Sequence, residues 1–206
     1  MLPVFTAQHN CAIMNRKILK GIHEPIRREI REEMRLFAAV QPSPEFQTAL
    51  AALQKRLRKA GVTGKYREPD GLHLTLAFIG EWPEDVTEFL PAVRKPFSVT
   101  LSHLGIFPEA NVLWAGIGPS PEMDRLAKQV RHSLAEAGIP FDRKAFSPHI
   151  TLARKPFIPE RVLLTAIEVP SVSMIVDDVC LYRSDRGKNG MAYTVIGRSS
   201  ENSSMM

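Results

Sequence analysis

The chain has 206 residues, of which 44% are hydrophobic and 24% charged, proportions that are ordinary for a globular protein with a buried core. A formal net charge of +5 and a pI near 9.4 favour an anionic partner such as nucleic acid. No apolar run reaches the roughly 18 residues that a membrane span needs, and the first residues lack the apolar core of a secretion signal. We therefore expect a cytoplasmic monomer with no membrane partner. Cys11 and Cys180 have neither metal-ligand nor redox spacing, which argues against a disulfide framework.

Residues 1–33 differ from the rest of the chain. Pro25 could open a short helix, around which three isoleucines recur every four residues with charged residues between them. We expect residues 1–33 to be an extension outside the fold, with a docking helix as the alternative. Met34 is an alternative start.

From Met34 onward, hydrophobic periodicity predicts a succession of strands and helices. In chain order these are a strand at 34–40, a helix at 45–60, the first motif strand at 72–79, a short helix at 84–90, strands at 97–104 and 112–117, a helix at 120–137, the second motif strand from 149, and strands within 169–181 and 191–196. Gly80 is predicted to end the first motif strand, and Gly61 and Gly138 stand where helix C-terminal caps belong.

Each long helix has one apolar face. The side chains expected to point inward are Phe46, Leu50, Leu53 and Leu57 in the first helix and Met123, Leu126, Val130 and Leu134 in the second.

One short pattern occurs twice, as HLTLA at 73–77 and HITLA at 149–153. Successive strand side chains point to opposite faces, so the His, Thr and Ala of each copy would share one face while the larger apolar residues enter the core. The two histidines lie 149 − 73 = 76 residues apart, and each motif strand follows a strand and a helix. The repeat predicts one site built from two similar halves.

This repeat predicts an α+β fold of two pseudo-symmetric lobes of mostly antiparallel sheet, flanked by helices, with an active-site cleft between them. Residues 34–197 would form this domain. Residues 198–206 are polar and are expected to be a disordered tail.

Two opposed histidines suit acid–base catalysis near neutral pH, because one neutral ring can accept a proton while a charged ring donates one. In-line displacement at phosphorus needs a base and an acid on opposite sides of the phosphate. Thr75 and Thr151 could donate hydrogen bonds to its non-bridging oxygens. No nucleophile elbow or phosphate-cradling glycine loop is present. A zinc site would need further ligands beside the histidines, so we expect neither a metal nor a cofactor.

Three further residues are candidates near the motifs. Arg154 has the wrong strand parity for the histidine face and would need a twist, a bulge or a strand end to reach a phosphate. Phe37 and Phe146 could stack on an unpaired base, with core packing as the alternative. The remaining histidines lack a threonine partner and are treated as non-catalytic; they are His9, His23, His103 and His132.

These paired His-x-Thr-x motifs resemble those of the two-histidine (2H) phosphoesterase superfamily, and more narrowly the RNA 2′,3′-cyclic phosphodiesterases, once called 2′-5′ RNA ligases. The resemblance covers about residues 34–197. It is carried by MRLFAAV, LHLTLAFIGE, LGIFP, VLWAGI, FSPHITLAR and LYRS followed by GMAYTVI.

The resemblance implies metal-independent hydrolysis of RNA 2′,3′-cyclic phosphate ends to 2′-phosphomonoesters, with reverse 2′-5′ ligation as a side activity. It implies that His73 donates a proton, that His149 accepts one, and that Arg154 contacts the phosphate. The residues alone leave open which histidine is the acid. They also leave open another cyclic or 2′-5′ linked nucleotide as substrate, and a non-catalytic module that binds RNA ends.

Overall fold

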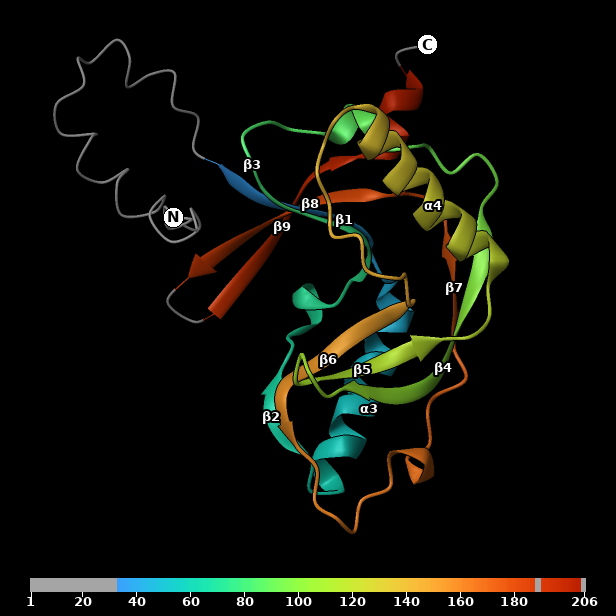
Figure 1. Ribbon diagram of the computed structural model, residues 1–206. Coiled ribbons are helices and arrows are strands. Elements are labelled where there is room, and N and C mark those ends of the chain that lie inside the picture. Colours follow the sequence, from blue (N-terminus) through green and yellow to red (C-terminus); the bar gives the residue numbers. More distant parts are fainter. Residues whose placement is uncertain (1–32, 188–189, 205–206) are drawn as a thin grey trace, which may run out of the picture. The chain divides into compact units, whose positions relative to one another are not determined.

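The computed structural model describes residues 33–187 and 190–204 (Figure 1). The chain divides into two units, Met1–Glu33 and Met34–Met206, and the description below concerns the second. The extension predicted for residues 1–33, with its helix near Pro25, lies outside the described residues except for Glu33. Within the described residues, no helix has the length and apolar character that a membrane crossing requires.

The described chain is rich in strands. These are β1 (Met34–Val40), β2 (Thr63–Tyr66), β3 (Leu74–Trp82), β4 (Phe97–Phe107), β5 (Val112–Ile117), β6 (His149–Phe157), β7 (Ser173–Val176), β8 (Cys180–Gly187) and β9 (Gly190–Arg198). The α-helices are α3 (Pro44–Lys59) and α4 (Pro121–Glu136), and the 3-10 helices are η1 (Pro69–Gly71), η2 (Thr87–Phe89), η3 (Leu164–Ala166) and η4 (Ser199–Ser204). Strand β2 was not predicted, since its four residues carry no clear alternation.

All nine strands join one sheet, in the order β7-β4-β5-β6-β3-β1-β8-β9, with β2 added on β6. Every pairing is antiparallel. The two motif strands, β3 and β6, lie at the centre and share one residue pair, Leu74 with Ile150. Strands β1, β8 and β9 continue from β3, and β5, β4 and β7 continue from β6 (Figure 1). The predicted α+β fold of two similar, mostly antiparallel halves is confirmed, while the cleft between them remains a prediction.

The two helices begin at capping serines and bury the predicted faces. The hydroxyl oxygens of Ser43 and Ser120 accept hydrogen bonds from the backbone N–H groups of Phe46 and Met123, at 3.3 and 3.2 Å. All eight apolar side chains predicted to point inward are buried. Helix α4 packs on β3 in the opposite half, and α3 contacts β2 and β7 (Figure 1). Each helix therefore covers strands of the half to which its own repeat does not belong.

Several predicted boundaries were wrong. Strand β4 continues to Phe107, past the end predicted at residue 104, and β8 continues to Gly187, past the end predicted at residue 181. Gly80 does not end the first motif strand: it adopts a φ of +90° within β3, where the register with β1 shifts by one residue. Glycine tolerates this backbone conformation, so the strand continues to Trp82. The helix predicted at 84–90 is reduced to the three residues of η2.

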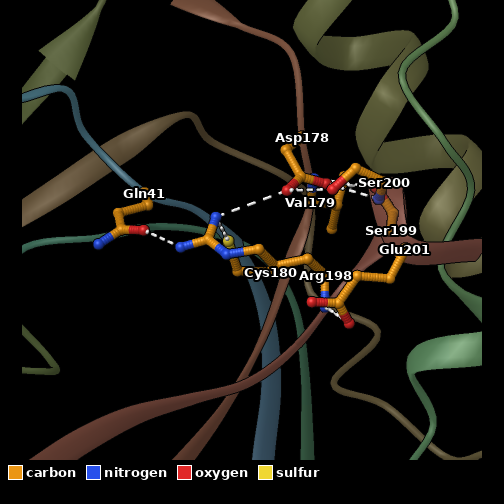
Figure 2. Close-up of polar contacts among 8 residues, drawn as sticks. All are labelled: Gln41, Asp178, Val179, Cys180, Arg198, Ser199, Ser200 and Glu201. Carbon is orange, nitrogen blue, oxygen red and sulfur yellow. Dashed lines mark hydrogen bonds and ion pairs between the residues drawn. The ribbon is translucent and has the colours of Figure 1, made fainter.

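Residues 198–206 were predicted to be a disordered tail, but Arg198 ends β9, Ser199–Ser204 form η4 and Ser199 is fully buried. Figure 2 shows why. The Asp178 carboxylate accepts hydrogen bonds from the Ser199 hydroxyl at 2.8 Å and from both N–H and O–H of Ser200 at 3.0 Å. The Arg198 guanidinium donates to Gln41 Oε1 at 2.7 Å. These bonds join the chain end to the β7–β8 connection and to the end of β1.

Candidate active site

The histidines and threonines of both motifs meet at the centre of the sheet. Counting outward from the antiparallel pair Leu74–Ile150, His73 falls opposite Thr151 and Thr75 falls opposite His149. Directly opposed residues have Cβ atoms about 4.5–5.5 Å apart, and diagonal ones about 7–8 Å. We therefore expect each histidine next to the threonine of the other motif and the two imidazoles diagonally across from each other. The effect of His149 on the pKa of His73 agrees with two neighbouring rings.

Each motif strand carries the same irregularity one residue after its threonine. In β3, Thr75 pairs with Ala39 but Ala77 pairs with Ala38, so Leu76 is an extra residue. In β6, Thr151 pairs with Trp114 but Ala153 pairs with Leu113, so Leu152 is the extra residue. A one-residue bulge reverses the facing of everything after it.

The bulges change two predictions about which residues share the histidine face. Ala77 and Ala153, predicted to lie on that face, are instead buried in the core. Arg154 pairs with Val112 two residues along β5 from Trp114, and so returns to the face of His149 and Thr151. Of the twist, bulge or strand end that Arg154 was predicted to need, a bulge is present.

The His73 ring packs against three aromatic side chains. Its ring centroid is 4.6 Å from that of Phe37, 4.9 Å from Tyr193 and 5.7 Å from Tyr182. Nδ1 of His73 is buried and has no hydrogen-bond partner in the part of the chain that the structure describes. The Gly71 carbonyl still favours a protonated ring, although it lies outside hydrogen-bond geometry.

His149 has a different setting. Its Nδ1 lies 2.7 Å from the carbonyl oxygen of Ser147, and because a carbonyl only accepts, Nδ1 carries the hydrogen. In the neutral ring Nε2 is then free to accept a proton. The rings of Phe107 and Trp114 flank His149, at centroid distances of 4.9 and 6.0 Å.

Both imidazoles are held toward the neutral form. Burial lowers the pKa of His73 to about 3, and the charge of Arg67 adds to this lowering. His149 lowers the pKa of His73 further, as expected for two rings that share one site. Burial also lowers the pKa of His149, against the opposing effect of its hydrogen bond to Ser147. A bound anion would reverse these shifts, because it stabilises a protonated ring.

The two phenylalanines proposed for base stacking have other contacts. Phe37 is 3% exposed and stacks on Tyr182 with ring centroids 5.0 Å apart, so it has no open face for a base. For Phe37 the core-packing alternative holds. Phe146 is partly buried against the core, under the Arg131 guanidinium 5.6 Å from its centroid. That ring lines a surface pocket with residues of α4, and base stacking by Phe146 remains a prediction that these contacts do not favour.

Comparison with known proteins identifies the family. The family model of the 2′-5′ RNA ligase superfamily matches residues 42–188. The chain belongs to this superfamily. Two curated relatives, each named RNA 2′,3′-cyclic phosphodiesterase, come from Thermus thermophilus and Thermotoga maritima. The first is 33% identical over 184 residues, covering 81% of this chain and 90% of the relative. The second is 29% identical over 175 residues, covering 79% and 93%.

Solved structures with a similar fold include two bacterial proteins. Escherichia coli LigT in its apo form gives a TM-score of 0.66 at 27% identity, over 81% of this chain and 96% of LigT. The Thermus thermophilus protein TT0787 gives 0.64 at 32% identity, over 80% and 96%.

Sequence reasoning missed two side chains near the superfamily motifs. Arg67 lies over the Tyr193 ring, 5.0 Å from its centroid, close enough to His73 to lower its pKa. His103 was treated as non-catalytic, yet it lies in line with His149 across β5: a Cβ added to the intervening Gly116 would come within 2.5 Å of the His103 ring. Neither has a local motif, and only the pairing of strands distant in sequence brings them to the site.

Proposed function

We propose that this chain hydrolyses 2′,3′-cyclic phosphate ends of RNA to 2′-phosphomonoesters, by acid–base catalysis between His73 and His149 without a metal. The observation that carries the proposal is the central pair Leu74–Ile150. Counted from this pair, each histidine is expected opposite the threonine of the other motif. The relatives named RNA 2′,3′-cyclic phosphodiesterase support the substrate class.

In the proposed reaction His149 is the base. Its Nδ1–H is occupied by the Ser147 carbonyl, so Nε2 can remove a proton from a water molecule as the water oxygen attacks phosphorus. The bond from phosphorus to the ribose 3′ oxygen breaks. His73, protonated once the phosphate is bound, gives its proton to that oxygen. The products are a 2′-phosphomonoester and a free 3′ hydroxyl.

Thr75 and Thr151 would stabilise the charge that builds on the two non-bridging oxygens. They come from opposite strands, so their hydroxyls can approach the phosphate from both sides. Arg154, on the same face after the bulge, would add a charge-assisted hydrogen bond. If a ribose 5′ hydroxyl attacks in place of water, the same groups produce a 2′-5′ linkage.

Product analysis tests the proposal. An RNA ending in 2′,3′-cyclic phosphate should give only the 2′-phosphate, at a rate that a chelator leaves unchanged. Loss of activity on chelation, restored by a divalent metal, would contradict the mechanism. A panel that adds mononucleotide cyclic phosphates and 2′-5′ linked oligonucleotides separates the alternative substrates, and binding of RNA ends without turnover would indicate a non-catalytic module.

A substrate with sulfur at the 3′ bridging position assigns the two histidines, because a thiolate leaves without protonation. We expect His73→Ala to regain most of its activity on this substrate, whereas His149→Ala stays inactive. The opposite pattern would exchange the two roles.

A further inference from the structure

Two cations, Lys65 on β2 and Arg67 immediately after its end, face the same way as the catalytic side chains. Lys65 pairs directly with Arg154 across the β2–β6 ladder, and Arg154 is on the face of His149 and Thr151. Tyr66, the next residue, packs against the core and donates its hydroxyl to the Val62 carbonyl at 3.0 Å. Since strand residues alternate, Lys65 and Arg67 on either side of Tyr66 point to the face opposite the core.

The position of Arg67 is fixed by backbone contacts at the β6 bulge. Its N–H donates to the Leu152 carbonyl at 2.8 Å. Gln54, only 4% exposed, donates from Nε2 to the carbonyls of both Arg67 and Leu152, at 2.8 and 3.2 Å. A buried amide on α3 thus joins the end of β2 to the bulge, and the Arg67 side chain leaves this junction toward Tyr193.

Ion pairing does not account for this group of cations. None of Lys65, Arg67 and Arg154 forms an ion pair within residues 33–187 and 190–204. Like charges directly across a ladder are destabilising. The Arg67 guanidinium is also half-buried, and its Nε has no hydrogen-bond partner among the described side chains and backbone. Unneutralised, converging cations of this kind attract a polyanion.

The cyclic phosphate alone does not need the positive charges of Lys65 and Arg67. A cyclic phosphodiester carries one negative charge and two non-bridging oxygens, for which Thr75, Thr151 and Arg154 already supply donors. Lys65 lies farther along the sheet than Arg67, by two strand residues or about 6.6–6.8 Å. The row formed by Arg67 and Lys65 therefore leads away from the two histidines, as a nucleic acid backbone leaving the site would.

We propose that Lys65 and Arg67 form a subsite for the phosphodiester that precedes the terminal nucleotide, so that this chain acts on oligonucleotide ends in preference to mononucleotide cyclic phosphates. This rests on the proposed function and adds the length of RNA that the site engages.

The test compares adenosine 2′,3′-cyclic phosphate with a trinucleotide that ends in the same group. We expect the unaltered protein to have the higher kcat/KM on the trinucleotide. Lys65→Gln and Arg67→Gln should each reduce this preference about five- to tenfold, mainly by raising KM for the trinucleotide. The slope of log kcat/KM against log salt should become shallower by about 0.7 for each cation that no longer binds a phosphate.

Arg94→Gln and Lys95→Gln are the matched controls, because both side chains are exposed on the loop before β4, and neither should change the preference. Equal losses on both substrates in the Lys65 and Arg67 variants would place these residues at the scissile phosphate and overturn the inference alone. No turnover of either substrate by the unaltered protein would overturn the proposed function and the inference with it. An unchanged urea unfolding midpoint for Lys65→Gln separates binding from folding.

Discussion

Strands β3 and β6 carry the same local sequence pattern and the same bulge, yet they build unequal surroundings for their histidines. His73 packs against phenylalanine and tyrosine rings, and its buried Nδ1 has no hydrogen-bond partner among the described residues. His149 has its Nδ1 fixed by the Ser147 carbonyl. The motif therefore sets which residues share one face of the sheet, while the neighbouring strands set how easily each imidazole takes up a proton.

The second residue after each bulge shows the same contrast. Phe78 and Arg154 both stand five positions after their histidine, and both are turned to the motif face. Phe78 joins the aromatic cluster of Phe37, Tyr182 and Tyr193, and Arg154 is exposed beside Lys65. One half thus surrounds its histidine with aromatic rings, and the other places positive charge on the motif face, where the proposed substrate would bind. The predictions below test this division of roles.

Removing either imidazole should have the largest effect. His73→Ala and His149→Ala should each lower kcat by about 10²–10⁴-fold, because each removes one proton transfer. His132→Ala, at an exposed position on α4, is the control and should leave kcat unchanged. Activity is measured by release of the 2′-phosphate, and circular dichroism verifies the fold. A folded His73→Ala variant with full activity would show that one half suffices.

The threonines should matter equally in the two halves, since the proposed function places both against the same phosphate. Thr75→Val and Thr151→Val keep the side-chain shape and remove the hydroxyl donor, so each should lower kcat about 10²-fold. Thr194→Val, exposed on β9, serves as the control. If only one threonine variant loses activity, the phosphate lies in one half of the site rather than between them.

The pH profile of kcat/KM should show the inequality of the two histidines. This profile reports the free protein, in which burial lowers both pKa values, that of His73 to about 3. The optimum should therefore lie on the acid side of the ordinary histidine pKa of about 6.5. The lower of the two pKa values sets the acid limb of the profile, and here it belongs to His73. Arg67→Gln removes a charge that lowers the pKa of His73. The acid limb should therefore move to higher pH while the alkaline limb stays. An unmoved acid limb would mean that Arg67 does not act on His73.

Asp178→Ala should lower stability rather than activity, because its contacts lie next to β8 and β9, in the half that holds His73. Loss of the carboxylate leaves the buried Ser199 hydroxyl without its acceptor, which should lower the free energy of unfolding by about 1–3 kcal/mol. Urea denaturation measures this, with the exposed Asp177→Ala as control. A loss of kcat as large as that of a histidine variant would show that this network supports the site directly.

Local periodicity predicted much of the fold. The apolar faces of α3 and α4, the strand β1 and the two motif strands follow from spacing within each segment, and so does the repetition of His and Thr at one facing. These features depend on neighbours a few residues away, which a sequence displays directly.

Features that depend on a partner strand were not predictable in this way. The bulges at Leu76 and Leu152 exist only relative to β1 and β5, and they decide that Arg154 faces the site while Ala77 and Ala153 do not. The sequence left base stacking and core packing both possible for Phe37. The structure decides for core packing, because Tyr182, on a strand far along the chain, stacks on its ring. The sequence alone determined that two His-x-Thr strands exist. Only the tertiary structure determined that they meet at Leu74 and Ile150 and that Arg67 lies beside them, because register between distant strands is set by packing across the whole sheet.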